Sequence, residues 1–205
     1  MDISFRPAHP GDVDDAIPLI YSSGPAAFEY IFGHPRRGAA REFLVRAFAS
    51  GGGELGFRSH TIAEVNGMIV GVGAAFSGSD NPGFFLAAAH QIWTFFSVDS
   101  LAVIRKGLQV EAVVPVPHGN MHYITHLGIA PEFRGQGIGS ALIQHLLEHG
   151  QASGRSLAVL DVAVSNPRAQ ALYKRMGFTV KTERAPGLAA QKAGIAPHRR
   201  MEKAL

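Results

Sequence analysis

Cysteine is absent from the 205 residues of this sequence. Its absence excludes disulfide bonds and thiolate chemistry, and it permits a reducing compartment. Charged residues are also scarce, at 17%, and no block of Lys or Arg alternates with aromatic residues. The formal net charge of +3 suits an anionic ligand, whereas a nucleic-acid partner is not expected.

A long uninterrupted apolar run is lacking too. The longest apolar stretch, residues 83–98, is interrupted by His90 and Gln91 and is too short to span a bilayer comfortably. Asp2 stands where a secretory signal would carry basic and then apolar residues. We therefore expect a cytoplasmic, soluble protein with no membrane partner.

What is present is a globular composition. Hydrophobic residues make up 46% of the chain, enough for a sizeable core. A chain of this length fits one domain of ordinary size. We expect a single domain over residues 1–205.

Turn signals and apolar patterns predict the elements of the first half of the chain. Asp12 is expected to cap a helix, with Asp15 as the acid of a capping box. Asn66 and Gly67 predict a two-residue hairpin turn, because both tolerate positive φ. The expected elements are a strand at 3–8, helices at 12–24 and 38–50, strands at 58–65 and 68–76, and one or two helices within 83–110.

From residue 121 onward, strands and helices alternate. Residues 156–164 are almost all apolar, which is typical of a buried strand. Residues 185–197 have the composition of a linker. The other expected elements are strands at 121–129, 178–184 and within 198–205, and helices at 137–149 and at 167–176, the latter closed by Gly177.

Residues 133–150, FRGQGIGSALIQHLLEHG, place three glycines between an expected strand and an expected helix. Backbone amides in such a turn lie at the positive end of the helix dipole and form a phosphate site. The ligand is therefore expected to be anionic. The turn is not a Walker loop, since no GK[ST] follows. It also departs from the dinucleotide-binding pattern, because Ser140 or Leu142 stands where the third glycine would be.

This stretch resembles the GCN5-related N-acetyltransferase family. The acetyl-coenzyme A loop of that family has the form Arg/Gln-x-x-Gly-x-Gly/Ala, which Arg134, Gly137 and Gly139 match. Residues 165–178, SNPRAQALYKRMGF, are similar to a second stretch of the family and lie at its usual distance from the first. The resemblance covers most of the chain. It implies an α/β fold of mixed type, with a central mixed sheet of six to seven strands, flanking helices and a helical insertion before the fourth strand.

The resemblance implies acetyl-coenzyme A as co-substrate, and no metal. The pyrophosphate would accept hydrogen bonds from the amides of residues 135–139. The strand ending at Ile129 would splay away from the strand around Asp161, and the pantetheine arm would lie between them. Asn166 would cap the next helix, contact the arm, or do both. The residues expected to contact coenzyme A are Leu127, Gly128, Ile129, Arg134, Gly135, Gln136, Gly137, Ile138, Gly139, Ser140, Asn166 and Tyr173.

The implied reaction needs a proton acceptor, because an alkylamine with a pKa of about 10 is almost wholly protonated at neutral pH. Alternation along residues 121–129 predicts His122 and His126 on one face of the strand, and Tyr123 and Thr125 on the other. Asp161 is the leading candidate, since some family members carry a glutamate base at its position. Others use the position of Tyr123. For either histidine, a buried structural role is expected ahead of catalysis.

Tyr173 is expected to protonate the departing thiolate, with a plain core tyrosine as the alternative. A rival signal lies on the helix that follows the glycines. His145, Glu148 and His149 spell H-x-x-E-H, the pattern of an inverted zinc peptidase. The match is short and has no evident third ligand, so a solvated helix face is favoured.

We therefore expect an N-acetyltransferase that transfers an acetyl group from acetyl-coenzyme A to a primary amine of a small molecule or peptide. Residues 83–119 are expected to shape the acceptor site. Two alternatives remain: a non-catalytic acyl-coenzyme A binding module, and a zinc hydrolase. A homodimer is compatible with the sequence, which does not name the acceptor amine.

Overall fold

The fold is built on one seven-stranded sheet, seen in a computed structural model that describes residues 2–35 and 39–205. The strand order is β1-β2-β3-β4-β5-β7-β6. Among the described strands, only β4 and β5 pair in parallel. The strands are β1 (Ile3–Pro7), β2 (His60–Val65), β3 (Met68–Ser77), β4 (Met121–Ile129), β5 (Leu157–Ala163), β6 (Thr179–Arg184) and β7 (His198–Ala204). The expected mixed sheet is confirmed.

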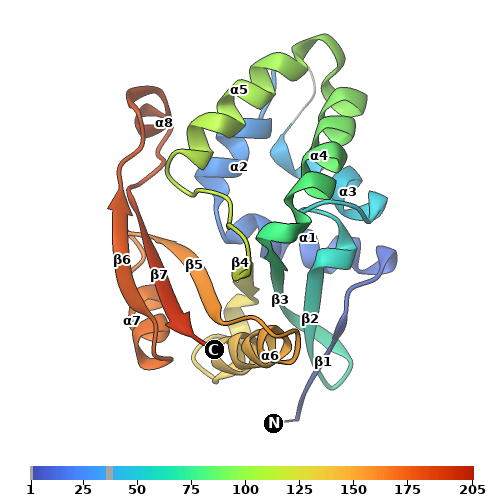
Figure 1. Cartoon of the computed structure of the whole chain (residues 1–205). Helices are drawn as coiled ribbons and strands as arrows, with labels where there is room; N and C mark the ends of the chain where they lie inside the picture. The colour runs from blue at the N-terminus through green and yellow to red at the C-terminus, as the bar shows by residue number, and fades with distance from the viewer. Residues whose placement is uncertain (1, 36–38) are drawn as a thin grey trace.

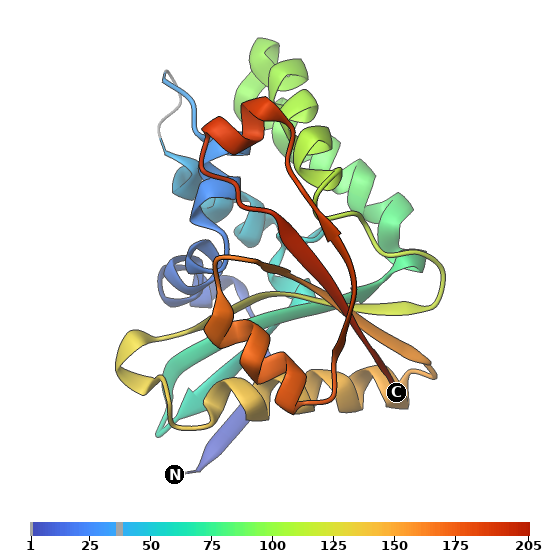
Figure 2. The same ribbon diagram turned by 90° about the vertical axis from the view of Figure 1, so that its left-hand side faces the viewer.

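Helices cover both faces of the sheet (Figures 1 and 2). On one face lie α1, α2 and α3, with α4 and α5 rising beside them, and on the other lie α6 and α7. The helices are α1 (Val13–Ser22), α2 (Pro25–Phe32), α3 (Ala40–Ser50), α4 (Asn81–Phe96), α5 (Ser100–Glu111), α6 (Ile138–Ala152), α7 (Pro167–Arg175) and α8 (Leu188–Lys192). The expected helical insertion before the fourth strand is therefore a pair of helices, α4 and α5.

Each face of the sheet has its own apolar core. Successive residues of a strand point to opposite faces, so Ile62 joins the core under α1–α3 while Ala63 joins the core under α6. The first core is rich in phenylalanine, including Phe43 and Phe96. Each fully buried side chain of this size contributes about 1.5–3 kcal/mol relative to exposure. The helices are thus held mainly by their apolar faces.

Local sequence signals located most elements, and the hairpin at Asn66 is confirmed. Asn66 and Gly67 both have positive φ, 51° and 76°, as a two-residue turn of this kind requires. Two helices were missed: α2, and α8 inside the stretch expected to be a linker. The helix expected at 38–50 begins at Ala40, and its first expected residue lies outside the described residues. None of the described helices is long and apolar enough to cross a membrane.

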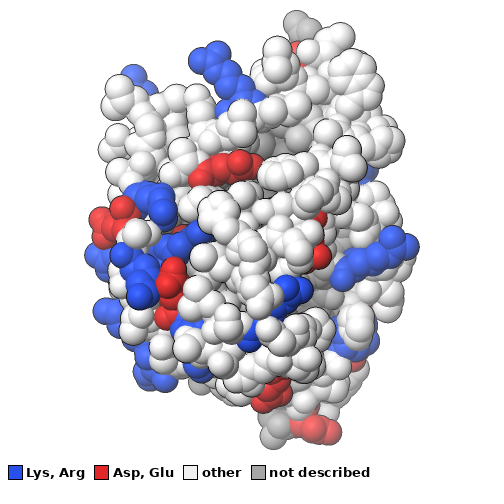
Figure 3. All heavy atoms as spheres, in the orientation of Figure 1, with Lys and Arg blue, Asp and Glu red and all other residues white. Residues whose placement is uncertain are grey.

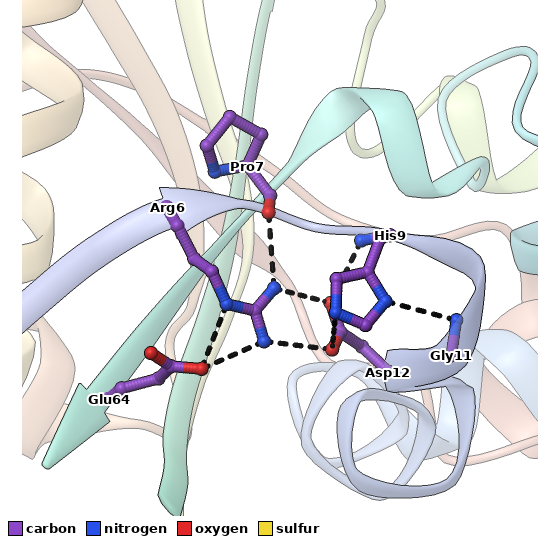
Figure 4. A network of polar contacts seen from close by, with 6 residues as sticks. All are labelled: Arg6, Pro7, His9, Gly11, Asp12 and Glu64. Carbon is purple, nitrogen blue, oxygen red and sulfur yellow. Dashed lines mark hydrogen bonds and ion pairs between the residues drawn. The ribbon is translucent and has the colours of Figure 1, made fainter. Parts of the chain in front are cut away.

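The expected capping role of Asp12 and Asp15 is wrong. The Asp12 side chain makes no cap bond to α1, because Arg6 on β1 holds it through hydrogen bonds of 2.7 and 2.8 Å (Figure 4). His9 instead caps the short 3-10 turn Pro10–Asp12 that precedes the helix. Burial tends to raise the pKa of Asp12, but hydrogen bonds from Arg6 and the His9 amide hold it below its usual range. A tertiary ion pair has replaced the local cap.

Asp12→Ala should lower the free energy of unfolding by about 2–3 kcal/mol, because the buried charge-assisted bonds to Arg6 are lost. Asp15→Ala is the matched control. It removes an exposed carboxylate whose helix-dipole contribution is under about 1 kcal/mol. Urea unfolding of both variants measures the difference. Equal losses would contradict the assignment of Asp12 as the residue that joins β1 to the start of α1.

Candidate active site

A gap between β4 and β5 forms the centre of the site. The two strands pair in parallel at only three positions, ending at Tyr123 and Val159, and then diverge. Both strands line the cavity that opens beyond this point, which has a volume of about 1300 Å³. The divergence expected between Ile129 and Asp161 is therefore present. It exposes strand backbone that a regular sheet would pair, so the cavity has polar walls as well as apolar ones.

The glycine turn lies at one end of this cavity. Gly135 and Gly137 have φ of 78° and 86°, and a Cβ at either position would meet only open space. No described carbonyl accepts a hydrogen bond from the amides of residues 135–137, and the first amides of α6 have no partner within the helix. The turn lines the cavity through Gly135 and Gly137, and its free N–H groups lie at the positive end of a helix.

Side chains around this turn hold it in place. Arg134 donates from Nε to the Ile129 carbonyl at 3.0 Å, and Gln136 donates to the Glu132 carbonyl at 3.0 Å. Ile138 is buried in the core under the sheet, while Ser140 lines the cavity. These contacts tie the turn to the end of β4 and leave its backbone amides free.

Residues at the end of β4 and the start of α7 line the same cavity. Gly128 lets α1 approach β4, since a Cβ there would lie 2.3 Å from the Leu19 carbonyl oxygen. Leu127 and Ile129 flank it and also line the cavity. Asn166 caps α7, accepting from the Ala169 amide at 3.1 Å. The capping role of Asn166 is confirmed, and its contact with a ligand stays a prediction.

Tyr173 on α7 lines the cavity between the two diverging strands. Burial raises the pKa of its hydroxyl to about 12, so the proton stays on the oxygen at neutral pH. The hydroxyl makes no hydrogen bond with any described residue. Every fully buried polar side-chain atom of the described chain has a partner. The Tyr173 oxygen is therefore open to the cavity, where it can donate to a ligand.

The expected alternation along β4 is wrong, because the strand contains a bulge. Ala74 pairs with Thr125 and Val72 with Gly128, so two residues of β4, His126 and Leu127, oppose the single Gly73 of β3. His126 lies in the bulge with a φ of 53°. His122 faces α6, where it contacts the Leu146 carbonyl at 2.8 Å.

His126 turns to the opposite face and packs on Phe28 and His60. The bulge thus brings His126 into the cavity. It leaves His122 in a structural role, since His122 is buried and its ring contacts Leu146 and His149 of α6.

Asp161 has three donors. Arg200 binds it at 2.7 Å through Nη2 and at 3.2 Å through Nε, and the Tyr123 hydroxyl donates to it at 3.0 Å. The Asp161 and Arg200 side chains are only 2% and 7% exposed. Burial and the negative charges of Asp161 and Glu54 raise the pKa of Tyr123 well above its usual value. Tyr123 therefore keeps its proton and shares it with Asp161.

The H-x-x-E-H residues on α6 have other contacts. His145 stacks on Phe5 with ring centroids 4.7 Å apart, and Glu148 accepts from Gln144 at 3.0 Å. No group of three His, Cys, Asp or Glu side chains within residues 2–35 and 39–205 is arranged to hold a metal ion. Nothing in the structure favours the zinc hydrolase alternative.

Sequence reasoning missed three ionisable residues near the cavity. Glu54 and Glu111 line it, and His60 stands behind His126. The one local signal was the glycine-rich stretch 51–56, GGGELG, which encloses a single acidic residue. Glu111 and His60 had no signal, because only the packing of α5 on α2 and α4, and the pairing of both β2 and β4 with β3, bring them to this place.

The family profile for "Acetyltransferase (GNAT) family" matches residues 30–178, about three quarters of the chain. The chain belongs to the GNAT family. An uncharacterised N-acetyltransferase of Methanocaldococcus jannaschii is 43% identical over 58 residues, 28% of this chain and 26% of the relative. The ribosomal protein bS18-alanine N-acetyltransferase of Escherichia coli K12 is 36% identical over 59 residues, 29% of this chain and 40% of the relative. The chain thus spans less than half the length of these curated relatives.

Solved structures share the GNAT fold over the whole chain. An N-acetyltransferase of Staphylococcus aureus Mu50 superposes with a TM-score of 0.68 at 17% identity, covering 98% of this chain and all of that one. At this identity the likeness concerns the fold alone. The oligomeric state of this GNAT protein, a homodimer or otherwise, stays a prediction.

We expect Asp161→Asn to lower the free energy of unfolding of this GNAT domain by about 3–5 kcal/mol, because Arg200 would keep a buried charge without its carboxylate. Glu183→Gln is the control. It weakens the exposed Arg199–Glu183 pair between β6 and β7, and should cost under about 1 kcal/mol. Chemical unfolding monitored by circular dichroism compares the two. A loss below about 1 kcal/mol for Asp161→Asn would show that the buried pair does not hold β5 to β7.

Proposed function

We propose that this protein transfers an acetyl group from acetyl-coenzyme A to a primary amine of a small molecule or peptide. One observation carries the proposal: the free amides of the glycine turn and the open hydroxyl of Tyr173 line the same cavity between β4 and β5. An anion held at the amides can therefore present a thioester within the cavity that Tyr173 faces. The family to which the chain belongs supports the same reaction.

The residues present fit coenzyme A. The amides of residues 135–139 suit the pyrophosphate, and the glycines at 135, 137 and 139 place no side chain over them. Arg134, Arg168 and Arg175 line the same cavity and add positive charge. Leu127 and Ile129 offer strand backbone to the pantetheine arm, and Asn166 has its amide nitrogen free of the cap bond.

The role we propose for Tyr173 is general acid. Attack of a neutral amine on the thioester carbon breaks the carbon–sulfur bond, and the sulfur leaves most easily as a thiol. Tyr173 carries a proton that no described residue shares, so it can give that proton to the sulfur. The second proton of the attacking nitrogen then restores the tyrosine.

Asp161 has no free acceptor site comparable to that of a solvated carboxylate, since Arg200 and Tyr123 occupy it. We therefore assign Asp161 and Tyr123 to positioning, with the Tyr123 ring forming the wall of the cavity at the point where the strands part. His126 faces the same cavity and is part of the proton chemistry considered below.

The acceptor chamber is the part of the cavity opposite the glycine turn. Its apolar wall comes from α2, α4 and α5, through Phe28, Phe32, Phe85, Ile92, Ile104 and Leu108. Figure 3 shows that Lys and Arg gather on the side of β6 and β7, whereas the surface over α4 carries little charge. This supports an acceptor with an apolar body, and it supports the expected role of residues 83–119 in shaping the acceptor site.

Gly137→Val should abolish stabilisation by coenzyme A. In the unmodified protein, coenzyme A at a hundred times its dissociation constant should add about 2.7 kcal/mol to the free energy of unfolding. Gly154→Val is the matched control, because Gly154 has a φ of 69° and open space around it but lies at the far end of α6. Both variants should lose a similar amount of stability to backbone strain, about 1–2 kcal/mol.

Thermal unfolding with and without coenzyme A measures both effects. A full coenzyme A shift in Gly137→Val would remove the glycine turn from the binding site.

Tyr173→Phe should reduce turnover by roughly a hundred-fold or more and leave acetyl-coenzyme A affinity nearly unchanged, as expected when a general acid is removed. An acyl donor with a more acidic thiol should recover part of the rate, because its sulfur needs less help in leaving. The measurements are turnover with both donors, coenzyme A affinity and melting temperature. A non-catalytic binding module predicts no turnover in the unmodified protein, and unchanged turnover in the variant would leave Tyr173 as a core residue.

A further inference from the structure

Glu54 faces the acceptor chamber from a tight glycine turn, residues 51–56, between α3 and β2. Gly53 has a φ of 74°, and a Cβ on Gly56 would lie 2.4 Å from the Gly51 carbonyl carbon, so only glycine permits this turn. The Glu54 side chain is 43% exposed, and it lines the cavity. None of the described Lys or Arg side chains pairs with it.

Two hydrogen bonds and one longer contact lead from this turn to Glu54. The Gly56 carbonyl lies 2.9 Å from His60 Nδ1, His60 Nε2 lies 3.1 Å from His126 Nδ1, and His126 Nε2 lies 3.5 Å from Glu54 Oε1. Burial lowers the pKa of His60 to about 4 and that of His126 well below its usual value. Both rings are therefore neutral at physiological pH.

The Gly56 carbonyl determines which ring nitrogen of each histidine carries the hydrogen. A carbonyl only accepts, so His60 Nδ1 carries the hydrogen and His60 Nε2 carries a lone pair. His126 Nδ1 must then donate to that lone pair, which leaves a lone pair on His126 Nε2. This lone pair belongs to the nitrogen that lies 3.5 Å from the Glu54 carboxyl oxygen. It repels a carboxylate and accepts a hydrogen bond from a carboxylic acid.

The ionisable groups that face Glu54 are His126 and Tyr123 on β4 and Glu111 on α5. Behind them stand His60 and the Asp161–Arg200 pair. Although the Glu54 side chain is partly exposed within the cavity, desolvation by the surrounding walls, and then the negative charge of Glu111, raise its pKa to about 7. A carboxyl group with this pKa is well matched to proton transfer near neutral pH.

We propose that Glu54 is the proton acceptor for the incoming amine, and that His60 and His126 are positioning residues that direct one lone pair toward it. The proposal rests on the proposed acetyl transfer. The ammonium group of the acceptor gives one proton to the Glu54 carboxylate, and the neutral amine then attacks the thioester carbon. The acid form of Glu54 donates to His126 Nε2 until it releases its proton to solvent.

The bulge in β4 is what makes this arrangement available. A regular strand would turn His126 toward α6, as it does His122. A left-handed backbone at a residue other than glycine is uncommon and costs about 1 kcal/mol or more, and such strain is concentrated at functional sites. Here it brings the imidazole to His60 and Glu54, where packing on Phe28 and His60 holds it.

The test is the pH dependence of acetyl transfer to a hydrophobic primary amine. The unmodified enzyme should gain activity as pH rises through about 7, because the ionised form of Glu54 is the active one. Glu54→Gln should lose about a hundred-fold or more of the turnover at pH 7. The remaining rate of the Glu54→Gln variant should keep rising with pH into the alkaline range, because the fraction of unprotonated amine rises. Glu42→Gln, an exposed acid on α3, is the control and should match the unmodified enzyme.

Two further variants separate proton transfer from simple packing. Glu111→Gln removes the like charge, so the pKa of Glu54 should fall. The acidic limb of the pH–activity profile should then move to lower pH. His60→Phe frees His126 to place a hydrogen on Nε2 and donate to the carboxylate, which should move the limb in the same direction. A purely structural role for His60 predicts a lower melting temperature with an unmoved limb.

Carbon-13 NMR of labelled glutamate carboxyl groups gives a readout that needs no substrate. The resonance missing from Glu54→Gln should titrate near pH 7, and at lower pH in Glu111→Gln. Titration near the ordinary value of about 4.3 would overturn the proposal. An active wild type with an equally active Glu54→Gln would overturn this proposal alone, whereas a wild type that acetylates no amine would overturn the proposed function with it.

Discussion

The divergence of β4 from β5 is the constraint on which the rest of the site depends. Parallel pairing stops after Tyr123 and Val159, so the sheet is continuous at one end and open at the other. Antiparallel partners hold the two halves firmly: β3 pairs with β4, and β7 pairs with β5 along its whole length. The open end can therefore persist without collapse. It supplies both the unpaired strand backbone and the volume that a thioester co-substrate needs.

Polar groups around this opening have distinct duties that follow from their surroundings. Asp161 is closed in by Arg200 and Tyr123 and joins β5 to β7 and β4. The Tyr173 hydroxyl keeps its proton and makes no hydrogen bond within the part of the chain that the structure describes. Glu54 is accessible from the cavity but surrounded by apolar wall and one like charge. Asp161 and Glu54 line the same cavity but differ in their partners. Arg200 neutralises Asp161, whereas no described Lys or Arg side chain pairs with Glu54.

The glycine turn and the bulge in β4 show two ways of placing chemistry with the backbone. Gly135 and Gly137 keep side chains away so that amides face the cavity. The bulge at His126 has the opposite effect, because it turns a side chain into the cavity. With regular alternation the His126 side chain would point to the other face of the sheet. The glycine turn depends only on residue type, so it is visible in the sequence. The bulge depends on the register between β3 and β4.

The sequence by itself determined the features that short-range physics controls: the hairpin at Asn66, the glycine turn before α6, the Asn166 cap, and the two motifs that indicated the family. These depend on neighbours within a few residues, so local pattern suffices. Only the tertiary structure decided the partners of Asp12 and Asp161, the face of His126 and the approach of Glu54 to it. Arg200 is 39 residues from Asp161 and His126 is 66 from His60. Such contacts follow from strand register and helix packing, which no local pattern encodes.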